Sequence, residues 1–289
     1  MEEHTGIILS DKLGYKVIDC AECGFAHLDP IPNSFVLDNY YKDFYTKHKP
    51  NYIKEAEEDL NWWHSWYSFY NKHLTTMSRG RTLLDVGSGP GFFIEYMRDK
   101  GWTCTGMDLS NPRNVEGVVE VDFSNMEVIW QSTLLKYHAI TMCEYLEHCP
   151  NPRYALRLAH SMLEDKGVLM LVVPNDFNPL QLMLVGKHGE YWVAPPAHIN
   201  YFNHTSLAKL LHSCGFSIHF RLSTFPVEAF SLISGTYGYD YIGNPSEGRR
   251  MHAHRKYIDG LLGPGTNPFY EGLVSLGIGR EIVLFAVKT

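Results

Sequence analysis

Two glutamates and a histidine lie close together in the stretch CEYLEHCPNP, residues 143–152. Glu144, Glu147 and His148 are spaced i, i+3 and i+4, which on a helical turn would place their side chains on one side. Such a group could hold a divalent metal, supply a general base, or simply end a strand and begin a helix. The choice depends on the elements that surround it.

A glycine-rich turn gives the most specific chemical signal. The stretch LLDVGSGPGFF, residues 83–93, predicts a strand that runs into Gly87, Gly89 and Gly91 and then into a helix. Because the turn has no Cβ atoms in the way, a ligand can lie against the backbone and the helix N-terminus. Asp108 ends the next predicted strand, where a carboxylate accepts hydrogen bonds from both ribose hydroxyls of an adenosine. We therefore expect an adenosine-containing cofactor.

The glycine spacing and one further acid indicate which cofactor this is. Nicotinamide dehydrogenases carry G-x-G-x-x-G, whereas this turn reads G-x-G-x-G and has Asp85 just before it. A carboxylate there is unfavourable beside a pyrophosphate because like charges repel, but it suits a ligand with an ammonium group. S-adenosyl-L-methionine has such an ammonium and no phosphate, so we expect it rather than a nicotinamide dinucleotide.

Strands and helices alternate around these residues and must position them. Helices, one of them near residues 125–135, separate five expected strands: RTLLDV, TCTGMDL, GVVEVDF, HAITMCE and VLMLVVPN. This alternation implies right-handed crossovers and a parallel sheet that is covered on both faces. The predicted fold class is α/β, with a doubly wound sheet.

The chain divides into two predicted parts. Residues 1–79 contain a CxxC segment and aromatic-rich helical stretches, which we interpret as a lid; most of the rings in EDLNWWHSWYSFYNKHL are also explained by simple packing on the next domain. Residues 80–289 form the cofactor-binding domain. Within it, loops at 176–204 and 225–280 are predicted to cap the substrate pocket.

Composition excludes several classes of protein. The 289 residues are 45% hydrophobic, which is ample for a buried core. With 25 basic and 32 acidic residues the net charge is -7, and no Lys/Arg cluster predicts binding to nucleic acid. The acidic N-terminus is unlike a signal peptide, and no apolar run approaches the roughly 18–20 residues of a membrane span. We expect a cytoplasmic protein whose six cysteines are reduced.

Taken together, the motifs resemble the seven-stranded class I S-adenosylmethionine-dependent methyltransferases over residues 80–175. The closing EIVLFAVKT is similar to their antiparallel seventh strand. The resemblance implies a Rossmann-like methyltransferase fold in which the glycine loop holds the methionine portion of the cofactor and later motifs hold the ribose, the adenine and the methyl group. The cofactor-binding residues that it implies are Asp85, Gly87, Ser88, Gly89, Gly91, Asp108, Leu109, Asp122, Phe123, Cys143 and Glu144.

Methyl transfer requires alignment of the acceptor and, for a hydroxyl acceptor, a base. His148 is one candidate, because it follows the strand that ends beside the expected methyl position and an imidazole titrates near neutrality. His198, in the proline-stiffened stretch PPAHINYF, is the second. Each also has a plain structural reading: His148 as a cap or packing residue, and His198 as an anchor of its loop.

Two metal sites are weighed and not adopted. The triad of Glu144, Glu147 and His148 resembles the E-x-x-E-H of the ubiquinone-pathway O-methyltransferases, where a divalent metal is the family feature; an imidazole is, however, a poor ligand for a hard cation. The N-terminal CxxC, Cys20 and Cys23, is similar to half of the zinc ribbon of some bacterial methyltransferases. Zinc prefers four ligands, so His4 and His27 would have to complete the set. We interpret this segment as a metal-free remnant.

The leading functional hypothesis is methyl transfer to a small molecule, with an oxygen of a sugar or natural-product metabolite as the expected acceptor. That substrate class rests on the similarity of CAECGFAHLDPIP and PPAHINYFNHTSLAKLLHSCGF to bacterial methyltransferases of small metabolites. Two alternatives stay open: a non-catalytic protein that binds the cofactor as a sensor or assembly partner, and a nicotinamide-dependent dehydrogenase. The sequence indicates neither the acceptor nor the oligomeric state.

Overall fold

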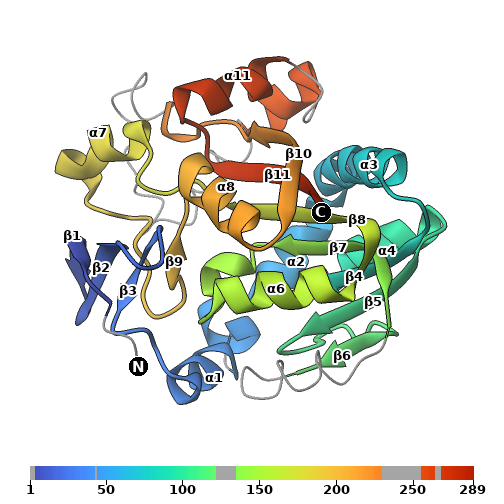
Figure 1. Ribbon diagram of the computed structural model, residues 1–289, viewed down its shortest axis with the longest axis horizontal. Helices are drawn as coiled ribbons and strands as arrows, with labels where there is room; N and C mark the ends of the chain where they lie inside the picture. The colour runs from blue at the N-terminus through green and yellow to red at the C-terminus, as the bar shows by residue number, and fades with distance from the viewer. Residues whose placement is uncertain (1–3, 43, 122–134, 230–254, 264–267) are drawn as a thin grey trace.

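A computed structural model describes residues 4–42, 44–121, 135–229, 255–263 and 268–289. Two sheets, one of seven strands and one of four, organise these residues (Figure 1). The predicted helix near residues 125–135 lies almost wholly outside the described ranges, as does much of the predicted cap at 225–280. None of the described helices combines the length and the apolar character that a bilayer crossing needs.

The central sheet has the strand order β10-β11-β8-β7-β4-β5-β6. Neighbouring strands from β8 to β6 are parallel, whereas β11 pairs antiparallel with both β8 and β10. The strands are β4 (Thr82–Val86), β5 (Thr103–Asp108), β6 (Val118–Glu120), β7 (Tyr137–Cys143), β8 (Leu163–Pro174), β10 (Phe216–Ser223) and β11 (Glu281–Lys288). The predicted α/β fold with a doubly wound, mostly parallel, seven-stranded sheet is confirmed.

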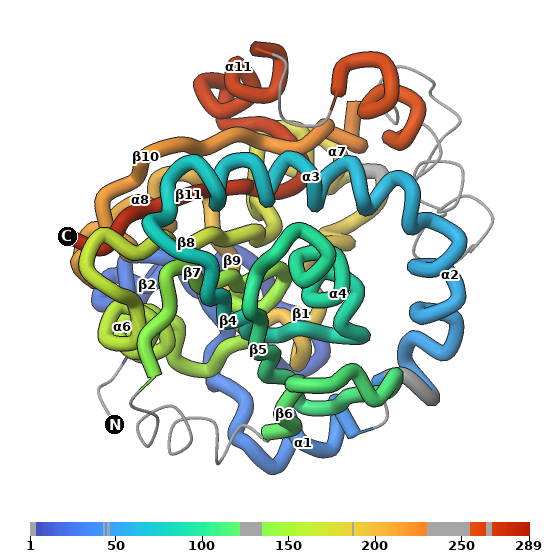
Figure 2. The backbone as a smooth tube through the Cα atoms, turned by 90° about the vertical axis from the view of Figure 1, so that its right-hand side faces the viewer, coloured from blue at the N-terminus to red at the C-terminus, as the bar shows by residue number. Residues whose placement is uncertain are grey.

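Helices cover both faces of this sheet because its strands bury alternate residues on opposite sides. Leu84 and Val86 of β4 belong to the core under α6 and α8, whereas Leu83 belongs to the core under α3, α4 and α11. Figure 2 shows α3 and α4 together on the side of the sheet away from α6. These helices are α3 (Leu60–Met77), α4 (Phe92–Asp99), α6 (Pro152–Met162), α8 (His204–Ser213) and α11 (Pro268–Leu276).

A second, antiparallel sheet was only partly predicted. Its order is β1-β2-β3-β9, from strands β1 (Gly6–Lys12), β2 (Tyr15–Cys20), β3 (Ala26–Asp29) and β9 (Asn200–Tyr201). The stretch GYKVIDC, residues 14–20, has the local pattern of one short strand, whereas β9 falls inside a segment predicted as a cap loop. The N-terminal segment and this cap therefore share one sheet and a small core that includes Val17, Leu28 and Trp192.

The segment predicted as cap loops at 176–204 also contains a helix, α7 (Pro179–His188). Asn178 caps its N-terminus by accepting from the backbone N–H groups of Leu180 and Gln181, and Gln181 completes the capping box. The sequence signal was present as N-P-L-Q, with proline at the first helical position. The expectation of a loop-rich cap was therefore wrong for these residues.

The aromatic helices divide into two roles. In α3, Trp62, Trp66, Phe69 and Tyr70 are buried in the core against the sheet, so the packing interpretation of this stripe holds. Helix α1 (Ser34–Lys42), the π-helical turn η1 (Phe44–His48) and α2 (Tyr52–Glu58) lie before it in the chain. These three elements place aromatic side chains at a cavity of the central sheet.

Candidate active site

A cavity of about 290 Å³ lies where β4, β5 and β7 end, near the lower limit of the roughly 300–1,000 Å³ typical of ligand pockets. The chain runs from β4 outward to β5 on one side and returns to β7 on the other, so the cavity occupies a switch point of the sheet, where α/β proteins bind ligands. The residues that line it are Tyr41, Phe44, Tyr52, Gly87, Gly89, Asp108, Leu109, Ser110, Cys143, Glu144, Tyr145 and His148.

The glycine loop forms one wall of this cavity. Gly87 has φ of 75° and Gly89 has φ of 53°, the left-handed region in which glycine is favoured. A Cβ atom on Gly87 would lie 3.0 Å from Tyr145, so a larger residue here would crowd the wall. The Asp108 carboxylate ties the loop to β5, because its Oδ2 accepts from the Gly89 N–H at 2.8 Å and its Oδ1 from the Ser110 N–H at 3.1 Å.

Asp108 fits the predicted ribose contact. Each carboxylate oxygen can accept more than one hydrogen bond, so both keep capacity for ligand hydroxyls. Burial raises the pKa of this carboxyl, although the backbone N–H groups of Gly89 and Ser110 oppose the effect. The side-chain-free surface of Gly87 and Gly89 beside it suits the close approach of S-adenosyl-L-methionine to the loop.

Three predicted cofactor residues lie behind the loop. Asp85 is 3% exposed, its Oδ1 accepts from the Thr141 hydroxyl at 2.6 Å, and burial raises the pKa of its carboxyl to about 7. Ser88 is buried, and Gly91 caps α4. These three are absent from the described cavity lining, so their contact with the methionine portion stays a prediction. Asp122 and Phe123, predicted at the adenine, lie outside the described residues.

Glu144 has an unusual backbone conformation at the end of β7. Its φ is 51°, which is rare for a residue with a Cβ and typical of functional sites. Glu144 is exposed and lines the cavity. The protein around it nevertheless removes much of its hydration, and the negative charge of Glu281 repels a second negative charge. Together these two effects raise the pKa of the Glu144 carboxyl to about 8. A protonated Glu144 can donate a hydrogen bond into the cavity.

The three residues of the E-x-x-E-H motif do not share one helical face. Leu146–His148 is a single 3-10 turn that begins after Glu144, and the left-handed φ of Glu144 turns it away from that helix. Glu147 is fully buried, and burial raises the pKa of its carboxyl well above the usual value. The expectation of one shared face was therefore wrong, because it assumed a regular helical turn. In the described ranges, these three side chains do not form a metal-ligand cluster.

His148 has its two ring nitrogens in different environments. Nδ1 lies 2.8 Å from the carbonyl oxygen of Ala197 and 2.7 Å from the Tyr41 hydroxyl. Because a carbonyl can only accept, the Nδ1 atom carries the proton, and Nε2 has a free lone pair. Burial lowers the pKa of the imidazole to about 4, so the ring is neutral at physiological pH. Nε2 lies 3.6 Å from Glu147 Oε1, beyond hydrogen-bonding distance.

His198, the second predicted base, packs edge-on against His148 with 4.9 Å between the ring centroids. It is not among the described residues that line the cavity. Its Nδ1 is buried without a hydrogen-bond partner, and burial together with His148 lowers the pKa of its ring well below the ordinary value. The geometry thus brings both histidines together but gives only His148 contact with the cavity.

Sequence reasoning missed the aromatic residues that cover the cavity. Tyr41 and Phe44 come from NYYKDFY and Tyr52 from the start of α2, and all three line the cavity. The available signal was the aromatic density of NYYKDFY, residues 39–45. The lid interpretation instead relied on the regular aromatic spacing of α3, whose buried tryptophans belong to the core. Tyr145, inside the E-x-x-E-H stretch, is the fourth cavity aromatic.

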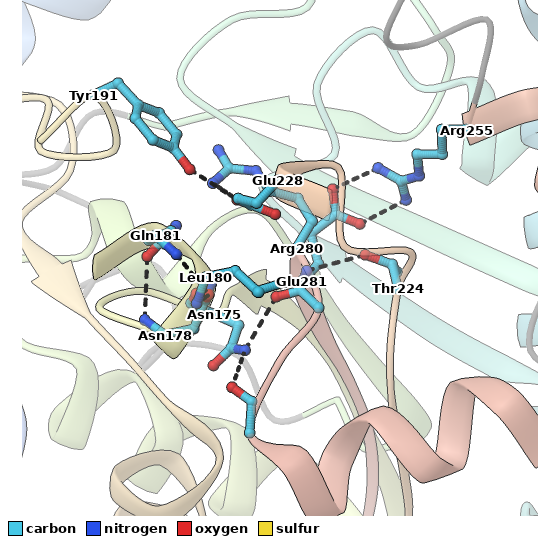
Figure 3. A network of polar contacts seen from close by, with 12 residues as sticks. Asn175, Asn178, Leu180, Gln181, Tyr191, Thr224, Glu228, Arg255, Arg280 and Glu281 are labelled. Atoms are coloured by element: carbon cyan, nitrogen blue, oxygen red, sulfur yellow. Dashed lines mark hydrogen bonds and ion pairs between the residues drawn. The ribbon is translucent and has the colours of Figure 1, made fainter. Parts of the chain in front are cut away.

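A charged network lies where β8 ends and β11 begins (Figure 3). Arg255 donates to both carboxylate oxygens of Glu281, at 2.9 and 2.7 Å. Burial alone would raise the pKa of Glu281, but the Arg255 guanidinium outweighs burial and lowers it. Glu228 accepts from the Tyr191 hydroxyl at 2.9 Å, and its Oε1 lies 3.7 Å from Arg280 Nη1. The ionised Glu281 is the charge that helps to keep Glu144 protonated.

The sequence matches a family model described as "Methyltransferase domain" over residues 49–219, more than half of the chain. Two curated relatives are both named "Ubiquinone biosynthesis O-methyltransferase". The protein from Pasteurella multocida is 28% identical over 154 residues, which cover 47% of this chain and 64% of the relative. The protein from Pseudomonas paraeruginosa is 29% identical over 121 residues, which cover 39% and 52%. The chain thus spans about half to two thirds of the length of these relatives.

Solved structures share the fold at low sequence identity. A 1,6-didemethyltoxoflavin-N1-methyltransferase from Burkholderia thailandensis is 15% identical, with a TM-score of 0.52 and 99% of each chain covered. A SAM-dependent methyltransferase from Archaeoglobus fulgidus is 18% identical, with a TM-score of 0.51 and 77% and 92% covered. The predicted family and its methyl donor, S-adenosyl-L-methionine, are confirmed by the family match, and the nicotinamide alternative was wrong. This chain belongs to the class I S-adenosyl-L-methionine-dependent methyltransferases.

Proposed function

We propose that the protein transfers a methyl group from S-adenosyl-L-methionine to a hydroxyl of a small molecule, of the sugar or natural-product class. The observation that carries this proposal is the neutral imidazole of His148, whose unprotonated Nε2 belongs to a side chain that lines the cavity at the ends of β4, β5 and β7. A hydroxyl acceptor needs such a base, because its proton must leave as its oxygen is methylated.

The cavity offers the groups that the cofactor requires. Asp108 would accept hydrogen bonds from the ribose hydroxyls, Gly87 and Gly89 would allow close approach of the methionine portion, and Leu109 would pack beside the adenine. When bound, S-adenosyl-L-methionine supplies a methyl group that its sulfonium has already activated. The protein then needs to orient the acceptor and exclude water rather than activate the donor.

The residues of the chain divide this work. His148 Nε2 would receive the acceptor's hydroxyl proton, while the carbonyl of Ala197 holds Nδ1–H and fixes the ring in the correct tautomer. A protonated Glu144 can donate a hydrogen bond to another oxygen of the acceptor. The rings of Tyr41, Phe44 and Tyr52 would cover the reacting groups. The names of the two curated relatives specify oxygen as the methylated atom, which supports a hydroxyl acceptor.

The proposal is tested in two steps, of which the first measures binding. Calorimetry should detect S-adenosylhomocysteine binding to the full chain. Replacement of Asp108 by Ala should weaken it about 10- to 100-fold, because hydrogen bonds to a charged group are lost. Asp99→Ala, at an exposed carboxylate of α4, is the matched control and should bind normally. Binding of NADH in place of S-adenosylhomocysteine would contradict the proposal.

The second step measures transfer. Incubation with methyl-labelled S-adenosyl-L-methionine and a metabolite extract should place the label on a compound that loses a free hydroxyl. Label on nitrogen or carbon would overturn the choice of acceptor atom. Cofactor binding without labelled product, over a broad panel of hydroxylated metabolites, would instead support the non-catalytic sensor.

A further inference from the structure

Four potential metal ligands converge outside the cavity lining, at the N-terminal sheet. His4, Cys20, Cys23 and His27 each offer one ligand atom, and these atoms all lie within 4.8 Å of one another. Among the residues that the structure describes, this is the one group of three or more His, Cys, Asp or Glu side chains whose ligand atoms are close enough together to hold an ion. Both cysteines are free thiols in the structure.

The distances match the dimensions of a tetrahedral zinc site. Zn–S bonds of about 2.3 Å and Zn–N bonds of about 2.0–2.1 Å at tetrahedral angles place a ligand nitrogen about 3.5 Å from a ligand sulfur. Nδ1 of His4 lies 3.4 Å from Sγ of Cys20 and 3.4 Å from Sγ of Cys23. Both nitrogen-to-sulfur distances from His4 therefore already match those of a coordinated set, and the other ligand-atom pairs lie within 4.8 Å.

The fourth ligand has a buried nitrogen with no other partner. The Nδ1 atom of His27 lies 2.8 Å from the carbonyl oxygen of Leu28, so Nδ1 carries the proton and Nε2 has the free lone pair. His27 is 1% exposed, and its Nε2 is buried with no hydrogen-bond donor in reach. An unpaired buried acceptor is costly, whereas a backbone carbonyl on the other ring nitrogen is the usual support of a metal-bound histidine.

A backbone N–H group also approaches one of the two cysteine sulfurs. Cys20 ends β2, and the turn to β3 returns the Cys23 N–H to within 3.4 Å of Cys20 Sγ, where it can stabilise a negative sulfur. Gly24 closes this turn with φ of 77°. The Cys20 thiol donates to Glu22 at 3.3 Å, and metal binding would displace this proton.

We propose that His4, Cys20, Cys23 and His27 form a closed, four-coordinate site for a zinc ion. Four protein ligands leave no position for water or substrate, so the site is structural rather than catalytic. It replaces the expectation of a metal-free remnant, because the two histidines that the CxxC lacked are in place. This proposal is independent of the reaction that the protein catalyses.

The site would fasten the N-terminal sheet to the methyltransferase domain. The carbonyl oxygen of Cys23 accepts from Arg153 Nη2 of α6 at 3.1 Å. The ring of Phe25, next in the same turn, lies 5.2 Å from that of Phe202. A zinc ion at this turn would thus fix the start of the segment that leads through α1 to Tyr41 at the cavity.

The first experiment measures metal content. The full chain, purified without a metal-affinity tag, should contain about one tightly bound zinc by elemental mass spectrometry. Cys23→Ser and His27→Ala should lose most of this metal. Cys214→Ser is the matched control. The sulfur of Cys214 is buried in the core under α6 and α8 and lies 3.7 Å from the Arg153 carbonyl oxygen, so the serine hydroxyl has an acceptor there. This control should keep the zinc.

A second measurement separates loss of a ligand from loss of the fold. His27→Cys restores a ligand that His27→Ala removes, so it should retain zinc. Cobalt exchanged into the wild-type site should show tetrahedral d–d bands and thiolate-to-cobalt charge transfer. The proposal would be overturned if Cys23→Ser kept its zinc or if the cobalt spectrum were that of an octahedral ion. A purified chain with reduced cysteines and no metal would also contradict it. So would a Cys20–Cys23 disulfide in the freshly purified protein.

Discussion

His148 differs from an ordinary surface histidine because its environment fixes the tautomer of the ring and disfavours its charged form. The Ala197 carbonyl and the Tyr41 hydroxyl hold Nδ1, and burial disfavours the charged ring. A lowered pKa makes His148 a weaker base but keeps it unprotonated wherever the protein is folded near neutrality. A weak base suffices if the proton leaves together with methyl transfer, when the acceptor oxygen becomes acidic.

We predict that the acid limb of kcat/KM lies near pH 4 to 5, below the ordinary histidine value of 6.5, because the pKa of His148 is lowered to about 4. The neutral ring is the active form, so activity should rise with pH through this limb and then level off. His148→Asn should remove the limb and lower kcat by about 10²- to 10⁴-fold. Rates are measured with saturating cofactor, and circular dichroism checks the fold at each pH.

His198→Asn is the matched control for this profile, since its ring touches His148 but not the cavity. We expect it to shift the acid limb while most of kcat is retained. An unchanged limb in His148→Asn, or a larger loss of kcat in His198→Asn, would contradict the assignment of the base.

The sequence indicated which residue types stand at the site better than it indicated how they are oriented. Asp108, Gly87 and Gly89 line the cavity as predicted, because a strand followed by a glycine turn largely fixes their position. The orientation of Glu144 could not be read in this way, because a left-handed φ at a glutamate is imposed by the surrounding fold. The burial of Glu147, next to the exposed Glu144, likewise depends on distant packing.

Among the elements, α3 adds hydrogen bonds to one buried carboxylate to its apolar packing against the sheet. Asp259 accepts from the indole N–H groups of Trp62 and Trp66 on one oxygen, at 2.9 and 3.0 Å. Its other oxygen accepts from the Tyr270 hydroxyl of α11 at 2.5 Å. Asp259 thus links α3 to α11, in the C-terminal region of the chain.

Replacement of Asp259 by Ala should lower the free energy of unfolding by about 3 kcal/mol or more, because three buried donors lose their acceptor at about 1–3 kcal/mol each. Asp259→Asn keeps the shape and one good acceptor oxygen, so its loss should be smaller. Asp99→Ala, on the exposed face of α4, should change stability by less than about 0.5 kcal/mol. Denaturant unfolding provides the comparison, and equal stability of Asp259→Ala and Asp99→Ala would refute this role.

The elements of the central sheet were predictable, whereas the N-terminal sheet was not. Strand β8 contains a continuous apolar run at residues 168–173, and four of the five residues of β4 are buried, the pattern of a buried parallel sheet. In contrast, β9 is two residues long and pairs with β3 from far along the chain. No local periodicity marks a strand that short, so its partner could not be inferred from the sequence.

At the scale of the whole molecule, buried titratable groups set how stability depends on pH. Burial raises the pKa of Asp85 and of Asp176 to about 7, whereas it lowers that of His148 and of His204 to about 4. The raised carboxyl values mean that the folded state binds more protons than the unfolded state from about pH 4 to 7, so these acids reduce stability as pH rises. The histidines act in the opposite direction, but only up to about pH 6.5.

We therefore predict that the free energy of unfolding falls as pH rises from about 6.5 to 7.5, where only the acids still respond. Asp176→Asn removes one of these buried charges, since Asp176 is 2% exposed. Between about pH 4 and 7, the stability of this variant relative to the wild type should increase by on the order of 4 kcal/mol at most. Above about pH 7 the difference should stay constant. Urea unfolding at several pH values measures the difference.

Asp165→Asn is the control, because it removes a carboxylate that is exposed at the start of β8 rather than buried. A difference for Asp176→Asn that does not vary with pH would show that Asp176 is ionised in the folded protein and that its burial is compensated.

The position of β11 also imposes an order on folding. This strand lies between β8 and β10, and its register joins Val173 to Ile282, residues that are distant along the chain. Closing so long a loop costs entropy before any pairing compensates for it, so we expect this pairing to form late in folding. Until then β8 presents an unpaired apolar edge to other chains. Nascent or refolding molecules are therefore most vulnerable to aggregation while they wait for the strand that completes the sheet.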